Sequence, residues 1–262
     1  MTQENQSSTE SMPQDARTGG SKPTPQDARA AQELLDFIGE CPSMFHTAST
    51  IAKRLMAAGF TYLPESEPWH VERNGAYFTT RNNSSIIAFK VAASLDNYHF
   101  QATASHGDSP TFKVKANAEL AGPGESRRLN VEVYGGSVDY TWFDRPLGIA
   151  GRIMVRNGNR VESRLYESAK ALAIIPSMPP HIQRDINQQF SPNRQVDLCP
   201  LISAGAPGKT TFDAIIANEL GISESDIVAR DLFLVNRQQP CIWGAAGEFA
   251  SSPKFDDLAC TY

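Results

Sequence analysis

The sequence predicts a mixed α/β fold, because its hydrophobic periodicity changes twice along the chain. Residues 25–60 repeat apolar side chains every three to four positions, as amphipathic helices do. From residue 76 to residue 167 apolar and polar positions alternate instead, which is typical of strands. Helical spacing returns over 210–221 and is followed by an apolar run over 226–236. Helices and strands together predict the mixed class.

Composition limits the kinds of protein this chain can be. Of its 262 residues 40% are hydrophobic and 20% charged, so it can bury a core and should be globular. The formal net charge of −5 does not favour binding to nucleic acid or to an anionic membrane. The sequence lacks both the run of roughly 20 apolar residues that spans a bilayer and the apolar centre of a secretory signal. We therefore expect neither a nucleic-acid nor a membrane partner.

The N-terminal part predicts a tail and two helices. Residues 1–25 are rich in Gln, Ser, Thr and Pro, which predicts a disordered tail. The second copy of the pentapeptide PQDAR then leads into a first helix. A second helix is expected over 46–60, where Ser49 or Thr50 can cap its start and Gly59 can end it in the left-handed conformation.

The middle of the chain predicts strands and the last part returns to helix. Alternation covers five short runs, residues 76–81, 85–92, 98–105, 111–116 and 128–135. Residues 151–167 predict a hairpin with Asn157-Gly158 at its turn. Gly221 should end the helix over 210–221. Residues 252–262 resemble a strand that leads into a helix, and the sequence stops inside that element.

The tripeptide His106-Gly107-Asp108 is the first candidate site. On a strand its histidine and aspartate would share one face, because side chains alternate with a period of two. A histidine that binds a metal usually has its second ring nitrogen held by an acceptor such as a carboxylate. His106 and Asp108 could therefore be a ligand and the group that orients it. The alternative is a surface turn with a His–Asp hydrogen bond, and the tripeptide alone favours that turn.

Three other motifs suggest chemistry, and each has an ordinary alternative. Gly107-Asp108-Ser109 resembles the block of a serine esterase family, but no Asp-x-x-His follows it to activate the serine. Residues 203–211 resemble a phosphate-binding loop, although Ser203 stands where that motif requires glycine. Asp256 and Asp257 could hold a divalent cation, or they could cap a helix start. Each motif by itself favours the ordinary loop or cap.

The cysteines indicate a reducing compartment. The four are Cys41, Cys199, Cys241 and Cys260, and none of them forms a Cys-x-x-Cys pair. A chain of this size does not depend on disulfides for a core. Ordinary thiols in a cytoplasmic protein are the simplest interpretation.

A longer pattern connects these pieces. It consists of LLDFIGECPSMFHTASTIAKRLMAAGFTYL, YFTTRNNSSIIAFKV, SHGDSP, VEVYGG, TWFDRPLGIAGRIMV, HIQRDINQQF, LCPLI and DLFLVNRQQPCIWGAAGEFASSPKFDDL. In this order and spacing, over about residues 30–262, the segments resemble the aspartyl aminopeptidases and their bacterial relatives. That family consists of metallopeptidases that use two zinc-type ions to remove N-terminal residues from peptides. A long collinear resemblance is more specific than any one motif.

The resemblance implies roles for individual residues. His106 would be a metal ligand, and Asp108 the carboxylate that orients it. Asp256 would bridge the two divalent ions. His181 would be the histidine that reaches an active site, that of a neighbouring subunit in the oligomer. Asp257 stands where the family usually has asparagine, which would add charge near the metals.

The resemblance also implies a domain organisation. Residues 26–111 and 206–262 would belong to a zinc-peptidase-like α/β catalytic domain. Residues 112–205 would form an inserted β-rich domain that drives homo-oligomer assembly. Peptides would be the substrates.

Family sequences continue past the last matched position, with a Glu-Glu pair, a further aspartate ligand and a late histidine ligand that this sequence lacks. Zinc in a catalytic site usually has about three protein ligands. We therefore expect the catalytic domain to be incomplete and the chain to be inactive alone. The alternative is a non-catalytic oligomerisation protein that derives from the same family.

Overall fold

The computed structural model describes residues 22–206, 208 and 210–262, so nearly all of the predicted tail lies outside the described residues. The helices in this part are α1 (Pro25–Glu40), α2 (Met44–Ala57), α3 (Phe212–Leu220) and α4 (Phe255–Leu258). The strands are β1 (Thr61–Tyr62), β2 (Ala76–Arg81), β3 (Ser85–Lys90), β4 (Thr111–Ala121), β5 (Arg127–Tyr134), β6 (Leu147–Asn157), β7 (Arg160–Glu167), β8 (Leu201–Ser203), β9 (Ile227–Asn236), β10 (Cys241–Trp243) and β11 (Phe249–Ser251). The predicted mixed α/β class is confirmed.

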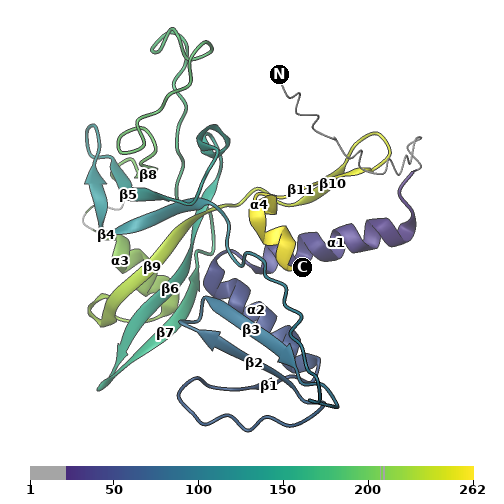
Figure 1. Cartoon of the computed structure of the whole chain (residues 1–262). Coiled ribbons are helices and arrows are strands. Elements are labelled where there is room, and N and C mark those ends of the chain that lie inside the picture. The colour runs from purple at the N-terminus through teal and green to yellow at the C-terminus, as the bar shows by residue number, and fades with distance from the viewer. Residues whose placement is uncertain (1–21, 207, 209) are drawn as a thin grey trace, which may run out of the picture.

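A six-stranded antiparallel sheet is the largest unit of the fold. Its strand order is β7-β6-β9-β4-β5-β8 (Figure 1). Strand β9 lies between β6 and β4, although it is the last of these six strands in the sequence. The sheet continues to Asn236, past residue 205, where the sequence analysis placed the end of the inserted domain. The division into two domains stays a prediction.

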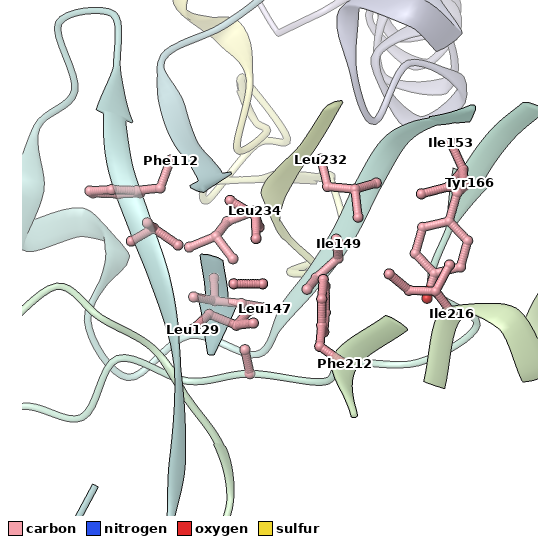
Figure 2. Close-up of a cluster of buried hydrophobic side chains, with 14 of the residues drawn as sticks. Phe112, Leu129, Leu147, Ile149, Ile153, Tyr166, Phe212, Ile216, Leu232 and Leu234 are labelled. Atoms are coloured by element: carbon pink, nitrogen blue, oxygen red, sulfur yellow. The ribbon is translucent and has the colours of Figure 1, made fainter. Parts of the chain in front are cut away.

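Residues 232–235 of strand β9 are buried on both faces of the sheet. Leu232 and Leu234 point into the main hydrophobic cluster, which also holds Phe212 and Ile216 of α3 (Figure 2). Phe233, on the opposite face, packs against α2 in a second cluster. Because neighbouring side chains on a strand point to opposite faces, a continuous apolar run fills both layers. The sheet is therefore covered by α3 on one side and by α2 on the other.

A smaller sheet carries the N-terminal strands, in the order β1-β2-β3. The run over 98–105 that predicted another strand has no regular secondary structure, so that prediction is wrong. Phe100 in this run is 89% exposed. A strand is stable only when a neighbouring strand accepts its backbone hydrogen bonds, and none in the described residues pairs with this run.

Helix α2 begins earlier than predicted, at Met44, with Ser43 as its N-cap instead of Ser49 or Thr50. The earlier start brings Met44 and Phe45 onto the sheet, where they are buried. The Ser43 hydroxyl lies 2.8 Å from Nδ1 of His46 and makes no cap bond to the backbone. Burial against the sheet therefore sets this boundary more than side-chain capping does.

Two other predicted boundaries can be compared with the structure. Gly221 ends α3 in the left-handed conformation, as predicted. The β6–β7 hairpin is also confirmed. Because Asn157 still pairs with Arg160, the two-residue loop is Gly158-Asn159. In the described part of the chain all four cysteines are free, and no helix there is long and apolar enough to cross a membrane.

Arg152 on β6 joins the two sheets. Its Nη2 and Nε atoms donate to one carboxylate oxygen of Asp231 at 2.8 and 3.0 Å. Its Nη1 donates to the backbone and side-chain oxygens of Asn82, in the β2–β3 turn, at 2.9 and 3.0 Å. The guanidinium also lies 4.4 Å from the centre of the Phe45 ring on α2. One side chain, only 14% exposed, therefore connects the large sheet, the small sheet and α2.

Replacing Arg152 with methionine should lower the free energy of unfolding by about 1–2 kcal/mol, because Asp231 loses the closer of its two cationic partners and keeps only Lys113, at 3.1 Å. Arg164→Met is the matched control, since that arginine is 40% exposed and pairs loosely with Glu162 at 3.7 Å. The control should change stability by less than about 0.5 kcal/mol. Urea unfolding followed by circular dichroism measures both, and equal effects would contradict this role for Arg152.

His46 should make folding stability depend on pH. Burial, with smaller contributions from Lys254 and Lys53, lowers the pKa of His46 to about 4. The unfolded chain, with a pKa of about 6.5, then binds the proton more readily than the folded chain. Stability should therefore be lost as pH falls from about 6.5 towards 4, by at most about 3 kcal/mol. His46→Gln should flatten the pH dependence of urea unfolding in this window, and an unchanged profile would contradict the assignment.

Candidate functional site

The last residues of the chain lie against the segment that leads into β4. The Thr261 hydroxyl donates to the carbonyl oxygen of His106, and it lies 2.9 Å from the Ser105 hydroxyl. Leu258 of α4 is buried in a cluster with Phe37 and Ile38 of α1. The Thr261 contacts join positions about 155 residues apart in the sequence. Together with the burial of Leu258, they bring the acidic residues of α4 near His106.

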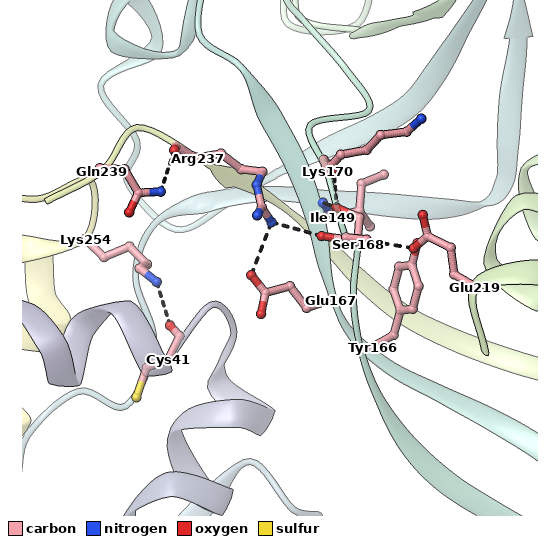
Figure 3. A network of polar contacts seen from close by, with 11 residues as sticks. Cys41, Ile149, Tyr166, Glu167, Ser168, Lys170, Glu219, Arg237, Gln239 and Lys254 are labelled. Atoms are coloured by element: carbon pink, nitrogen blue, oxygen red, sulfur yellow. Dashed lines mark hydrogen bonds and ion pairs between the residues drawn. The ribbon is translucent and has the colours of Figure 1, made fainter.

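Lys254 links the start of α4 to the C-terminal end of α1. Its Nζ donates to the carbonyl oxygen of Cys41, at the C-terminal end of α1, at 2.8 Å (Figure 3). A cation at the carbonyl end of a helix is favourable because the helix dipole is negative there. Burial lowers the pKa of Lys254 to about 8. The segment before Asp256 is therefore tied to the first helix.

His106, Asp108 and Tyr134 form a chain of hydrogen bonds. Nδ1 of His106 lies 3.0 Å from Oδ1 of Asp108, and the Tyr134 hydroxyl donates to Oδ2 of the same carboxylate at 2.6 Å. Burial by itself would raise the pKa of Asp108, but the hydrogen bonds from Tyr134 and His106 keep it below its usual value. The hydrogen bond to Asp108, its charge and the charges of Asp257 and Asp256 raise the pKa of His106. This geometry places the predicted ligand beside its predicted orienting group.

Asp256 and Asp257 do not act as helix caps. Lys254 is at the N-cap position of α4, and no side-chain cap bond is formed there. Both aspartates have non-helical backbone angles, and the peptide bond between them is cis. The Cys260 thiol donates to Oδ1 of Asp257 at 2.7 Å. The negative charges of both carboxylates help to raise the pKa of His106.

His181 does not join this group. It is exposed and lies in the long connection between β7 and β8. Figure 1 shows that connection projecting beyond the sheet, away from α4. The same connection covers a cavity of about 690 Å³ that is lined by Phe143, Met178 and Phe190 among others. Within one chain the predicted substrate-contacting histidine is thus separate from the predicted metal ligands.

The alternative motifs find little support. The Ser109 hydroxyl oxygen is buried and has no hydrogen-bond partner in the described part of the chain, so nothing there activates it as a nucleophile. In the phosphate-loop resemblance, Pro207 and Lys209 lie outside the described residues. The remainder of that loop leads from β8 to Thr211, which caps α3 with its side chain. An ordinary loop before a helix is the arrangement that the sequence favoured.

The donor types at this site suit zinc, but the number of ligands is small. Imidazole nitrogen and carboxylate oxygen are both common zinc ligands. Nδ1 of His106 faces Asp108, and the imidazole is 67% exposed, so Nε2 is accessible to an ion. Among the described residues, however, no group of three or more His, Cys, Asp or Glu side chains is arranged to hold a metal. His106 and Asp256 have donor types that suit zinc, but in the described part of the chain they do not form a complete metal site.

Some residues of the site had no assigned role at the sequence level. Tyr134 is part of the VEVYGG segment, but nothing in that segment indicates a bond to Asp108. Lys254 and Thr261 make their contacts to Cys41 and to His106, more than 150 positions away in the sequence. A single sequence gives no signal for such contacts, because they depend on how distant segments pack.

Comparison with known proteins identifies the family. The sequence model of the M18 family, described as aminopeptidase I zinc metalloprotease, matches residues 37–262. The chain belongs to the M18 aminopeptidase family. The predicted resemblance to aspartyl aminopeptidases and their relatives is thereby confirmed. The family model describes zinc metalloproteases, and the curated relatives are named as aminopeptidases.

Individual M18 relatives agree with this. A probable M18 family aminopeptidase 2 from Clostridium acetobutylicum is 39% identical over 234 residues, which are 87% of this chain and 54% of that protein. A structure of the Ape4 and Nbr1 complex matches with a TM-score of 0.82 and 32% identity, over 88% of this chain and 48% of the matched one. The S. cerevisiae mApe1 dodecamer matches with a TM-score of 0.71 and 25% identity, over 88% and 53%. The chain thus spans about half the length of the M18 relatives it matches.

Replacing Asp108 with asparagine should lower the pKa of His106 towards the value of about 6.5 that an unperturbed histidine has. The variant removes the charge and the carboxylate acceptor that account for most of the raised pKa. An NMR titration of the imidazole resonances measures the change. Asp96→Asn is the control, because that exposed aspartate bonds to Ser94 and not to His106. An equal shift in both variants would contradict the pairing with Asp108.

Proposed function

We propose that this chain carries part of the active site of a zinc-dependent aminopeptidase that removes N-terminal residues from peptides. The single observation that carries the proposal is the convergence of His106, Asp108 and the acidic pair of α4 in a chain of the M18 family. The name of the family model, zinc metalloprotease, supports zinc as the metal.

In this proposal each residue has a separate task. His106 offers Nε2 to a divalent ion, while Asp108 holds Nδ1. Asp256 offers a carboxylate that can bridge two ions, as the family resemblance implies. Bound zinc would lower the pKa of a water molecule and polarise the peptide carbonyl. Asp257 adds negative charge beside these ligands, which favours the binding of cations.

The proposal extends to assembly and to location. The β-rich part over 112–205 would mediate homo-oligomerisation, and His181 on its projecting connection would reach the active site of a neighbouring subunit. A dodecamer among the M18 structures supports assembly. Two of the four free cysteines are exposed, which suits a reducing compartment such as the cytoplasm.

The purified 262-residue chain alone should show little or no peptidase activity. The described residues form no group of three or more side chains that could hold a metal, whereas a catalytic zinc usually has about three protein ligands. Release of free amino acids from unblocked peptides measures activity, with and without added zinc. Hydrolysis that is lost with a chelator and in His106→Ala, but kept in His99→Ala, would contradict this prediction and support a complete site.

A second candidate is a non-catalytic oligomerisation protein. Two observations favour it. The six-stranded sheet has a well-buried hydrophobic core, whereas the described residues contain no group of three or more side chains that could hold a metal. Size-exclusion chromatography with light scattering, combined with metal analysis, separates the two proposals. A stable oligomer without bound zinc supports the interaction protein. A chain that binds zinc stoichiometrically supports the aminopeptidase.

A further inference from the structure

Tyr134 lies where two neighbouring strands bring it to the site. It is the last residue of β5 and pairs with Thr111, the first residue of β4. The segment from His106 to Thr111 enters β4 at that point, so Asp108 comes close to the tyrosine hydroxyl. The pairing register of β4 and β5 therefore determines which side chain meets the carboxylate.

The ring of Tyr134 has little freedom to move. It packs edge-on against Phe233 of β9, with ring centres 5.3 Å apart, and it borders the cluster that contains Met44 and Phe45 of α2. These contacts fix the position of the Tyr134 hydroxyl relative to the sheet. The donor is thus positioned by the core before it meets Asp108.

The imidazole of His106 has no comparable support of its own. It is 67% exposed, and the only hydrogen bond found for this ring in the described part of the chain is the one to Asp108. The terminal torsion of an aspartate is broad, so a carboxylate held on one side only can rotate. Tyr134 binds the oxygen that His106 does not use, at 2.6 Å, and so prevents that rotation.

This arrangement selects one form of the neutral imidazole. A carboxylate accepts hydrogen bonds and cannot donate them, so the nitrogen that faces Asp108 has to carry the proton. Nε2 is then unprotonated and points away from Asp108, as a metal ligand requires. The tautomer and the direction of the ring both depend on Asp108 staying in place.

We propose that Tyr134 is a positioning residue of the metal site, which clamps Asp108 so that His106 presents Nε2 to a divalent cation. The proposal deepens the zinc-aminopeptidase function above and rests on it for the identity of the bound ion. The clamp itself is a property of three side chains in this chain, and it can be measured without metal.

The test is the Tyr134→Phe variant of the full chain, which keeps the ring and removes the hydroxyl. Long-range ¹H–¹⁵N NMR at about pH 9, where the imidazole is neutral, reports which nitrogen of His106 carries the proton. His106→Gln identifies the resonances among the five histidines. We expect the Nδ1–H form to dominate in the wild type and to become a mixture with the Nε2–H form in Tyr134→Phe.

Tyr140→Phe is the matched control. Tyr140 is 65% exposed, and its ring packs edge-on against Phe190 instead of bonding to the site. The His106 tautomer should not change in this control. An unchanged tautomer in Tyr134→Phe, or an equal change in both variants, would overturn the clamp.

Zinc binding separates the clamp from the proposed function. Titration with Zn²⁺ alone should give an affinity that is about 10- to 100-fold lower in Tyr134→Phe than in the wild type and in Tyr140→Phe. If no variant binds zinc but the tautomer still changes, the clamp holds and the zinc function fails. If zinc binds equally to all three and the tautomer does not change, the clamp fails and the zinc function stands.

One measurement avoids the risk that a variant does not fold. In the wild-type chain the hydrogen-bonded Tyr134 hydroxyl proton should give its own slowly exchanging ¹H resonance. A hydroxyl that exchanges freely with water would contradict the clamp, whatever the variants show.

Discussion

The burial of residues 232–235 of β9 on both faces of the sheet is the constraint on which much of this molecule depends. Leu232 and Leu234 complete the core under α3, while Phe233 on the other face supports α2 and the ring of Tyr134. Through Phe233, the same strand also positions the Tyr134 ring for its hydrogen bond to Asp108. A change at Phe233 would therefore reach the candidate metal ligand His106 through three contacts, by way of Tyr134 and Asp108.

The candidate site is assembled almost entirely by long-range contacts. The acidic residues of α4 reach His106 because Leu258 is buried against α1 and because Lys254 binds the carbonyl oxygen at the end of that helix. The segment with His106 has no strand of its own to hold it. Its position comes from Thr261 on one side and from Tyr134, through Asp108, on the other. Such a site is preorganised by packing more than by secondary structure.

Membership of the M18 family gives this geometry its functional meaning. The chain matches about half the length of its relatives, and its described residues contain the His106–Asp108 pair, the acidic pair of α4 and a six-stranded antiparallel sheet. A hydrolase with two metal ions needs more ligands than the proposed pair, His106 and Asp256, would supply. The positioning of those two residues can still be studied alone, because it depends on side chains that the structure describes.

The sequence by itself determined the local and the chemical parts of this protein. Hydrophobic period predicted the mixed α/β class, Gly221 the end of α3, and a collinear set of motifs the family and its pair His106 and Asp108. Tertiary structure decided the rest. The run over 98–105 alternates like a strand but has no neighbour to pair with, and α2 begins at Met44 because burial on the sheet outweighs a later cap. The place of Tyr134 in the site also depends on tertiary structure. The pairing register of β4 and β5 and the packing around the ring bring it to Asp108, and neither can be read from one segment of the sequence.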